Sequence, residues 1–258
     1  GIGDSSAKGF QGHFDGNGFK VWNLNGHTYN DCGLFGRLGD GAVIQNLTIA
    51  SGTIGGAYNN SIGGIAGQIV ENATVTIKNC HNYATLIGNW GIGGIVGQIE
   101  NGASATFENC SNHGTINAAY TGGGIVGQVG PNRWKANGAK AAVINCYNVG
   151  TIQGNGTWGL GGLVGSYRLC GAGQVIRNSY NAGRVSNSET AGAIFGSIAE
   201  SDLTIENVFY LDSSNNAVSG VFTDGGDDTV GTVTGNAIAK SQTEMCGADV
   251  LSLLGTAF

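Results

Sequence analysis

The sequence predicts an all-β fold: a parallel β-helix of about seven rungs, closed by a short capping helix at its C-terminal end. Three observations predict this fold. An apolar-x-Asn phrase occurs seven times, a Gly-apolar-apolar-Gly phrase recurs in phase with it, and no unit has room for a helix between them. Self-similarity of this kind, with a period of about 30 residues, is typical of stacked repeats in which each coil buries the apolar face of the next.

The composition agrees with short strands joined by tight turns. The 258 residues include 49 Gly and 1 Pro, and only 11% are charged. The 41% of apolar residues exceeds what a disordered polar chain would carry. The formal net charge is −6 without any basic run, so we expect no nucleic-acid partner. No apolar stretch reaches the length of a membrane span, and we expect no membrane insertion.

The Asn of the first phrase predicts a bend in each coil. Consecutive copies are 23, 33, 30, 36, 33 and 29 residues apart. Asn tolerates the left-handed backbone and bonds nearby backbone groups, and Asn amides in register form a ladder. A structural ladder is the favoured interpretation, and a binding role for these side chains is the alternative. The seven residues are Asn23, Asn46, Asn79, Asn109, Asn145, Asn178 and Asn207.

The glycine phrase predicts a strand with one inward face. Alternation places Ile65, Gly67 and Ile69 on the interior side. The opposite side carries Ala66 and Gln68, and we expect it to face outward with stacked Gln amides bonding along the rod. A third strand-like segment follows the Asn phrase, as in Gly114–Ile116 and Gly150–Ile152.

Three of the six cysteines share one repeat position. Cys80, Cys110 and Cys146 directly follow the repeat Asn, where other copies have Leu, Val or Ser. Such a position is an inward core position, and stacked side chains point in parallel rather than at each other. We therefore favour free buried thiols over disulfides. Because no Cys-x-x-Cys occurs, we expect no metal site.

Two features that vary between copies are candidate ligand-binding elements. Trp90, Tyr120 and Trp158 occupy one repeat position, seven residues before the final Gly of the strand phrase. Exposed rings in that row would pack against sugar rings, and the alternative is that they cover the glycine-rich turns. The insertion 130–138 carries Arg133 and Trp134, and loops on a rigid scaffold often carry recognition.

The C-terminal part differs from the repeats. We expect a β-helix over 1–210 and an irregular tail over 211–258 whose helix packs on the β-helix. Ser241 and Glu244 match a helix capping box, and apolar residues at helical spacing predict an amphipathic helix over 241–255. This helix would cover an end of the stack, where unpaired strand edges invite aggregation.

Several segments resemble GLUG-motif repeat domains of bacterial surface and secreted proteins, which also occur near immunoglobulin A1-cleaving M26 metallopeptidases. The similar segments are Phe10–Gly18, Val21–Leu24, Gly33–Gly36, the later Gly-Gly-Ile-Val-Gly-Gln copies and Ala239–Phe258. The resemblance implies a right-handed β-helix within a larger bacterial surface protein. It does not extend to peptidase activity, which needs His-Glu-x-x-His. None of the four His residues is followed by Glu.

The functional expectation is a non-catalytic scaffold module with adhesin activity, binding a glycan or a host surface protein. The alternative is a polysaccharide lyase or glycosidase with a groove along the rod, which would need two carboxylates some 5–10 Å apart. We expect no cofactor, an extracellular or cell-surface location with the signal peptide absent from this sequence, and further domains in the same polypeptide.

Overall fold

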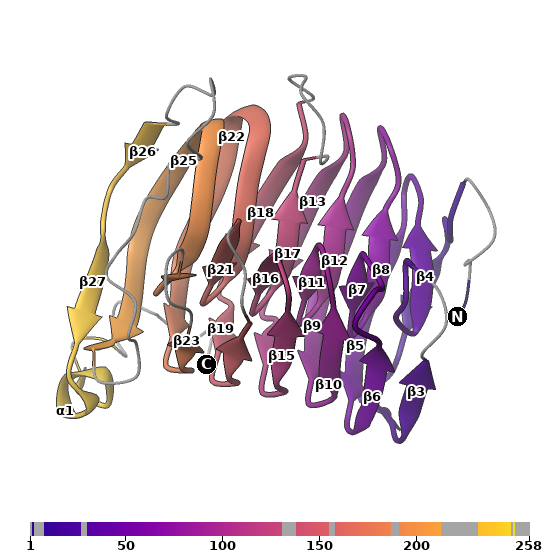
Figure 1. The fold of residues 1–258 in the computed structure, drawn as a ribbon, viewed down its shortest axis with the longest axis horizontal. Coiled ribbons are helices and arrows are strands. Elements are labelled where there is room, and N and C mark those ends of the chain that lie inside the picture. The colour runs from indigo at the N-terminus through magenta and orange to yellow at the C-terminus, as the bar shows by residue number, and fades with distance from the viewer. Residues whose placement is uncertain are drawn as a thin grey trace.

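The computed structural model describes residues 2, 8–26, 30–130, 138–154, 158–186, 191–212, 232–248 and 250. Successive coils pair in parallel, as β9 (Thr74–Asn82) does with β13 (Ser104–Glu108) and β8 (Ala66–Ile69) with β12 (Val96–Ile99). Figure 1 shows the coils side by side along a rod, from the N-terminal end to the C-terminal strands β26 (Thr232–Thr234) and β27 (Ala237–Lys240). The predicted parallel β-helix is confirmed. The described part contains about six turns, where we expected about seven.

The strands form five rows along the rod, here numbered in chain order from the glycine phrase. Row I contains β4 (Phe35–Leu38), β8 (Ala66–Ile69), β12 (Val96–Ile99), β17 (Val126–Val129) and the first parts of β22 (Val164–Asn181) and β25 (Phe195–Leu211). Row II contains β1 (His13–Asp15), β5 (Val43–Ile49), β9 (Thr74–Asn82), β13 (Ser104–Glu108), β18 (Lys140–Ile144), the middle of β22 and β25, and β26 (Thr232–Thr234).

The other three rows hold shorter strands. Row III contains β2 (Lys20–Val21), β14 (Ser111–Asn112), β19 (Tyr147–Asn148), β27 (Ala237–Lys240) and the last residues of β5, β9, β22 and β25. Row IV contains β3 (Leu24–Gly26), β6 (Gly52–Gly55), β10 (Thr85–Gly88), β15 (Ile116–Ala118), β20 (Ile152–Gln153) and β23 (Val185–Ser186). Row V contains β7 (Ile62–Gly63), β11 (Ile92–Gly93), β16 (Thr121–Gly123), β21 (Gly159–Gly161) and β24 (Ala191–Gly192).

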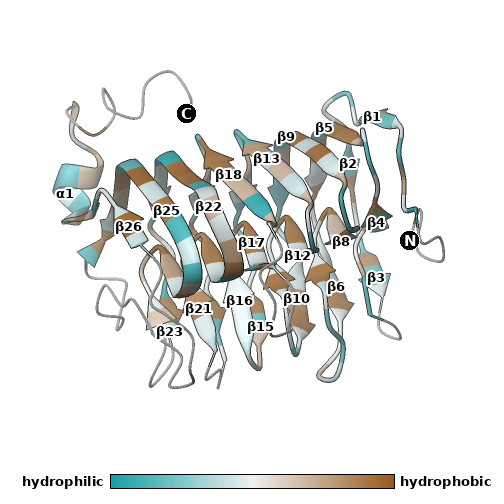
Figure 2. Cartoon of the chain, turned by 90° about the horizontal axis from the view of Figure 1, so that it is seen from above, coloured by the Kyte–Doolittle hydropathy of each residue, from teal (hydrophilic) through white to brown (hydrophobic). Residues whose placement is uncertain are grey.

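The core is a set of apolar columns running along the rod. In row II the fully buried Ile44, Ile77, Phe107 and Val143 stack in register on successive coils. Figure 2 shows hydrophobic segments recurring at matching places on neighbouring strands. Fully burying one such side chain contributes about 1.5–3 kcal/mol. These columns position every outward side chain at a fixed spacing.

Row I is buried on both sides, which corrects the prediction that one side faces outward. Val96 and Val126 lie on the side expected to face solvent, yet both are fully buried. Row V folds back beside row I, and a Cβ on Gly97 would lie 2.5 Å from the Ile62 nitrogen of the preceding coil. Real Cβ atoms do not approach that closely, so the final Gly of each phrase permits two backbones to touch.

Strand pairing continues beyond residue 210. Strands β26 and β27 both pair in parallel with β25. The helix α1 spans Gln242–Met245, and Ser241 with Glu244 forms the predicted capping box. Val250 packs against Phe209, with Met245 beside them. The last residues of the predicted helix 241–255 lie outside the described residues. Within the described ranges, no helix has the length and apolarity that crossing a membrane requires.

Candidate functional site

Six of the repeat asparagines form a hydrogen-bonded series at the corner between rows II and III, here called the corner ladder. All six have left-handed φ angles between 46° and 56°. Each Asn Nδ2 donates to the Oδ1 of the preceding coil's Asn at 3.0–3.3 Å, and Asn46 donates to Asp15 at 3.0 Å. The corner ladder contains Asn46, Asn79, Asn109, Asn145, Asn178 and Asn207.

Asn23 does not belong to the corner ladder, although its sequence phrase and its φ of 55° match. Its partner is Ser51, whose hydroxyl donates to Asn23 Oδ1 at 3.3 Å. The register pairs Asp15 with Gln45, so Asp15 and Gly16 occupy the first corner. Hydrogen bonds from Asn46, the Asn17 backbone and Gln45 lower the pKa of Asp15, and the first rung of the ladder is thus a carboxylate acceptor.

The structure also contains a second, fully buried Asn ladder that sequence reasoning missed. Asn82, Asn112, Asn148 and Asn181 are completely buried, and their amides join in series at 2.8 Å. Each Nδ2 also donates to a backbone carbonyl two residues ahead. The sequence feature that could have revealed this buried ladder is an Asn two residues after each repeat Cys or Ser. The corner ladder joins six coils and the buried ladder joins four of them, on the two sides of row III.

The three aromatic rings at the shared repeat position lie together, as predicted, but they pack against one another. They are Trp90, Tyr120 and Trp158, here called the tryptophan row. Trp90 and Tyr120 stack with centroids 4.4 Å apart and planes at 15°. Trp158 lies 5.4 Å from Trp90, and the Arg168 guanidinium covers it at 4.8 Å. The cavity between this row and row I encloses about 10 Å³, which is room for one water at most. This packing favours the alternative in which the rings cover the turns.

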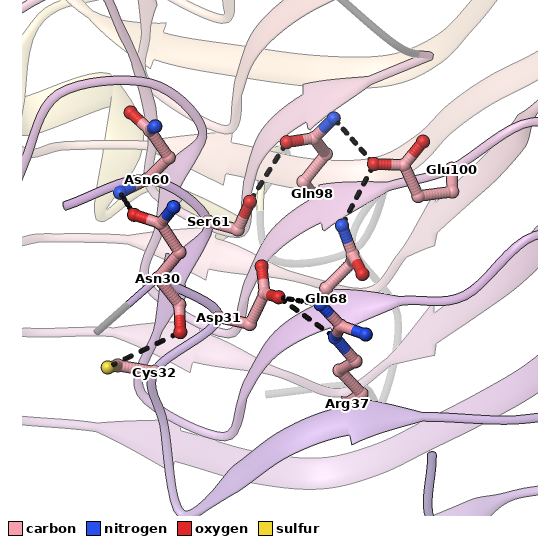
Figure 3. Close-up of polar contacts among 9 residues, drawn as sticks. All are labelled: Asn30, Asp31, Cys32, Arg37, Asn60, Ser61, Gln68, Gln98 and Glu100. Atoms are coloured by element: carbon pink, nitrogen blue, oxygen red, sulfur yellow. Dashed lines mark hydrogen bonds and ion pairs between the residues drawn. The ribbon is translucent and has the colours of Figure 1, made fainter. Parts of the chain in front are cut away.

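A polar cluster lies at the N-terminal side of that row (Figure 3). Arg37 Nε and Nη2 both donate to Asp31 Oδ2, at 2.8 and 2.6 Å. Gln68 and Gln98 occupy matching positions on successive coils. They do not bond to each other as expected, because both Nε2 atoms donate to Glu100 Oε1 at 2.9 Å.

The surroundings of Glu100 in this cluster alter the acidity of its carboxyl group. Burial raises its pKa, and the nearby charges of Glu71 and Asp31 add to the effect. A raised carboxyl pKa is a property of general acids. However, Oε1 already accepts two amide hydrogen bonds, so this oxygen serves the cluster. Elsewhere, Glu108 and Glu206 form surface ion pairs with Lys78 and Arg177, at 3.1 and 3.2 Å.

All six cysteines are free thiols in the structure, which confirms the favoured interpretation for Cys80, Cys110 and Cys146. Cys80, Cys110 and Cys146 are fully buried in one column with Leu47. Burial raises the pKa of Cys146, and it raises the pKa of Cys170 to about 12. Reactive cysteines are thiolates with access to solvent, and all four of these thiols are shut off from solvent. In the described ranges, no group of three or more His, Cys, Asp or Glu residues could hold a metal.

A cluster of rings and imidazoles on the outside of row III was not foreseen. Tyr83 stacks on His113 with centroids 4.2 Å apart and planes at 11°. The Ser111 hydroxyl connects His81 Nδ1, at 2.8 Å, to His113 Nε2, at 3.1 Å. Tyr147 approaches the same Nε2 at 3.3 Å. Burial lowers the pKa of both imidazoles, with the His81 charge also acting on His113. This cluster can be recognised only from the strand register, which places its residues on neighbouring coils.

The candidate loop residues Arg133 and Trp134 lie outside the described residues.

The fold is similar to a crystal structure from Bacteroides ovatus that carries the description "putative immunoglobulin A1 protease". The TM-score is 0.63 at 21% identity, and the match covers 93% of this chain and 71% of that chain. At this identity the likeness shows the fold alone. No family model matches the chain, and no curated protein matches it. Membership of the GLUG-motif repeats therefore stays a prediction from the quoted segments.

Proposed function

We propose that the chain is a non-catalytic β-helix module of a bacterial cell-surface or secreted protein, and that it binds glycans on its outer surface. The observation that carries this proposal is the group of exposed rings on the first three coils. Trp22 is 64% exposed, Phe19 73% and Tyr83 48%. Exposed aromatic groups on an otherwise well-buried scaffold mark interaction surfaces, and their amphipathic rings suit wet contacts with sugars.

The scaffold supports this role because it keeps outer side chains at fixed spacing. Two Asn ladders and a continuous apolar core connect the coils. A ligand would therefore meet a rigid surface and lose little affinity to ordering of the protein.

A glycan array probed with the intact chain tests the proposal. We expect binding to a restricted set of oligosaccharides. Trp90→Ala and Trp158→Ala are included because the tryptophan row is the other candidate surface, and loss of binding in both variants would assign the ligand to that row. Absence of binding to every glycan would contradict the proposal and leave a spacer module.

A polysaccharide-active enzyme is the second candidate, favoured by the raised pKa of Glu100 beside Glu71 and Asp31. Its test is the appearance of new reducing ends or unsaturated products when polysaccharides are incubated with the protein. Activity that disappears in Glu100→Gln would establish this alternative. Unchanged polysaccharides are the result that the non-catalytic proposal expects.

A further inference from the structure

The strand register aligns two outward columns on row III near the N-terminal end of the rod, where β2, β5 and β9 lie side by side (Figure 2). Lys20 pairs with Thr48, and Thr48 pairs with His81. Two residues further along each strand, the same register aligns the second column. The backbone bonds from Ala50 N to Val21 O and from Tyr83 N to Ile49 O, both 2.8 Å, fix it. The second column is Trp22, Ala50 and Tyr83.

The register places Ala50 between two exposed aromatic residues of the second column, an arrangement here called the slot. Trp22 and Tyr83 are two rungs apart, which places their backbones about 10 Å from each other. Ala50 lies between them and has only a methyl group. A ring placed midway would lie about 5 Å from each aromatic ring, within the range of stacked pairs. One face of Tyr83 is already held by His113, so its ring is fixed in place.

The first column gives this slot a polar side. Residues i and i+2 of a strand point to the same face, so Lys20 lies beside Trp22, Thr48 beside Ala50, and His81 beside Tyr83. The imidazole of His81 is held through Nδ1 by Ser111 at 2.8 Å. The slot thus offers two apolar ring faces and, along one edge, an ammonium, a hydroxyl and an imidazole.

We propose that Trp22 and Tyr83 clamp one sugar ring of a glycan over Ala50, while Lys20, Thr48 and His81 bind hydroxyl groups at its edge. The proposal rests on the glycan-binding function above and names its binding slot. A sugar ring has the required combination of apolar faces and a hydroxyl-bearing edge. The ammonium of Lys20 at the edge disfavours a cationic ligand, which an aromatic clamp would otherwise suit, and it favours sugars carrying a carboxylate.

Titration calorimetry with maltotriose, chitotriose and sialyllactose, together with any oligosaccharide bound on the array, tests the slot. We expect Trp22→Ala and Tyr83→Ala each to weaken binding about tenfold. Ala50→Leu should weaken it by at least as much, because the larger side chain fills the slot without removing either ring. Lys20→Ala should weaken sialyllactose more than the neutral sugars.

Tyr58→Ala is the matched control, since this Tyr is 91% exposed and lies on another part of the coil. It should bind like the wild-type protein, and thermal unfolding of each variant verifies the fold. Wild-type affinity in Trp22→Ala, Tyr83→Ala and Ala50→Leu would overturn the slot and leave the glycan-binding function standing. A wild-type protein that binds none of these sugars and nothing on the array would contradict both.

Discussion

Replacing Asn112 by Ala removes a link in the middle of the buried ladder. Three hydrogen bonds disappear: Nδ2 donates to Asn148 Oδ1 at 2.8 Å and to Gly114 O at 2.9 Å, and Oδ1 accepts from Asn82 Nδ2 at 2.8 Å. A buried hydrogen bond contributes about 1 kcal/mol net, and a buried group left without a partner costs about 1–3 kcal/mol. Because water does not reach this site, we expect Asn112→Ala to lower the free energy of unfolding by about 3–5 kcal/mol.

Asn109→Gly in the corner ladder is the control for this variant. It also removes ladder bonds, to Asn79 at 3.1 Å and from Asn145 at 3.2 Å, but solvent replaces them. Gly adopts the left-handed φ of 55° at this position without strain. We expect a loss of about 1 kcal/mol or less. Urea unfolding followed by circular dichroism measures both, and a loss in Asn112→Ala no larger than in Asn109→Gly would refute the reasoning.

Three further predictions concern packing, thiols and pH. Gly97→Ala should destabilise the fold by about 1–3 kcal/mol, because the added methyl group would contact the Ile62 backbone. Gly26 has no atom within 4 Å of an added Cβ, so Gly26→Ala should unfold like the wild type. Equal urea midpoints for the two variants would contradict this prediction. In the native protein a thiol reagent should label the exposed Cys246 at once and the buried Cys80, Cys110, Cys146 and Cys170 only after denaturation; rapid native labelling of the buried four would disprove the burial. Burial lowers the pKa of His81 and His113 in the fold, so the unfolded chain takes up protons first and stability should fall as the pH drops below about 6.5. Urea midpoints between pH 7.5 and roughly pH 5 measure this loss, and His113→Gln should reduce it; an unchanged slope in that variant would remove His113 from the explanation.

The sequence predicts the fold well because the repeat phrases report directly on backbone geometry. Six repeat asparagines adopt the left-handed conformation at one corner, as a bend requires. Asn23 shows where phrase matching fails, since its φ is the same but the register pairs its strand with a later part of the coil. Row V was missed because two-residue strands such as Ile92–Gly93 carry no periodicity.

Side-chain sites were harder to predict than the backbone. The shared position of Trp90 and Tyr120 was visible in the sequence, but their mutual stacking depends on side-chain directions that no spacing reveals. Asn112 looks like a surface residue, because Asn is seldom fully buried unless its amide is fully bonded. The slot at Trp22 and Tyr83 depends on the register of three coils of unequal length, since the insertions between repeats conceal which residues become neighbours.

The most direct test of the glycan-binding account is one glycan array probed in parallel with the wild-type chain and with the double variant Trp22→Ala, Tyr83→Ala. The account predicts that the wild-type protein binds a defined subset of oligosaccharides and that the double variant, still folded, binds none of them. Equal binding by both proteins would contradict the slot, and a blank array for the wild type would contradict the function itself.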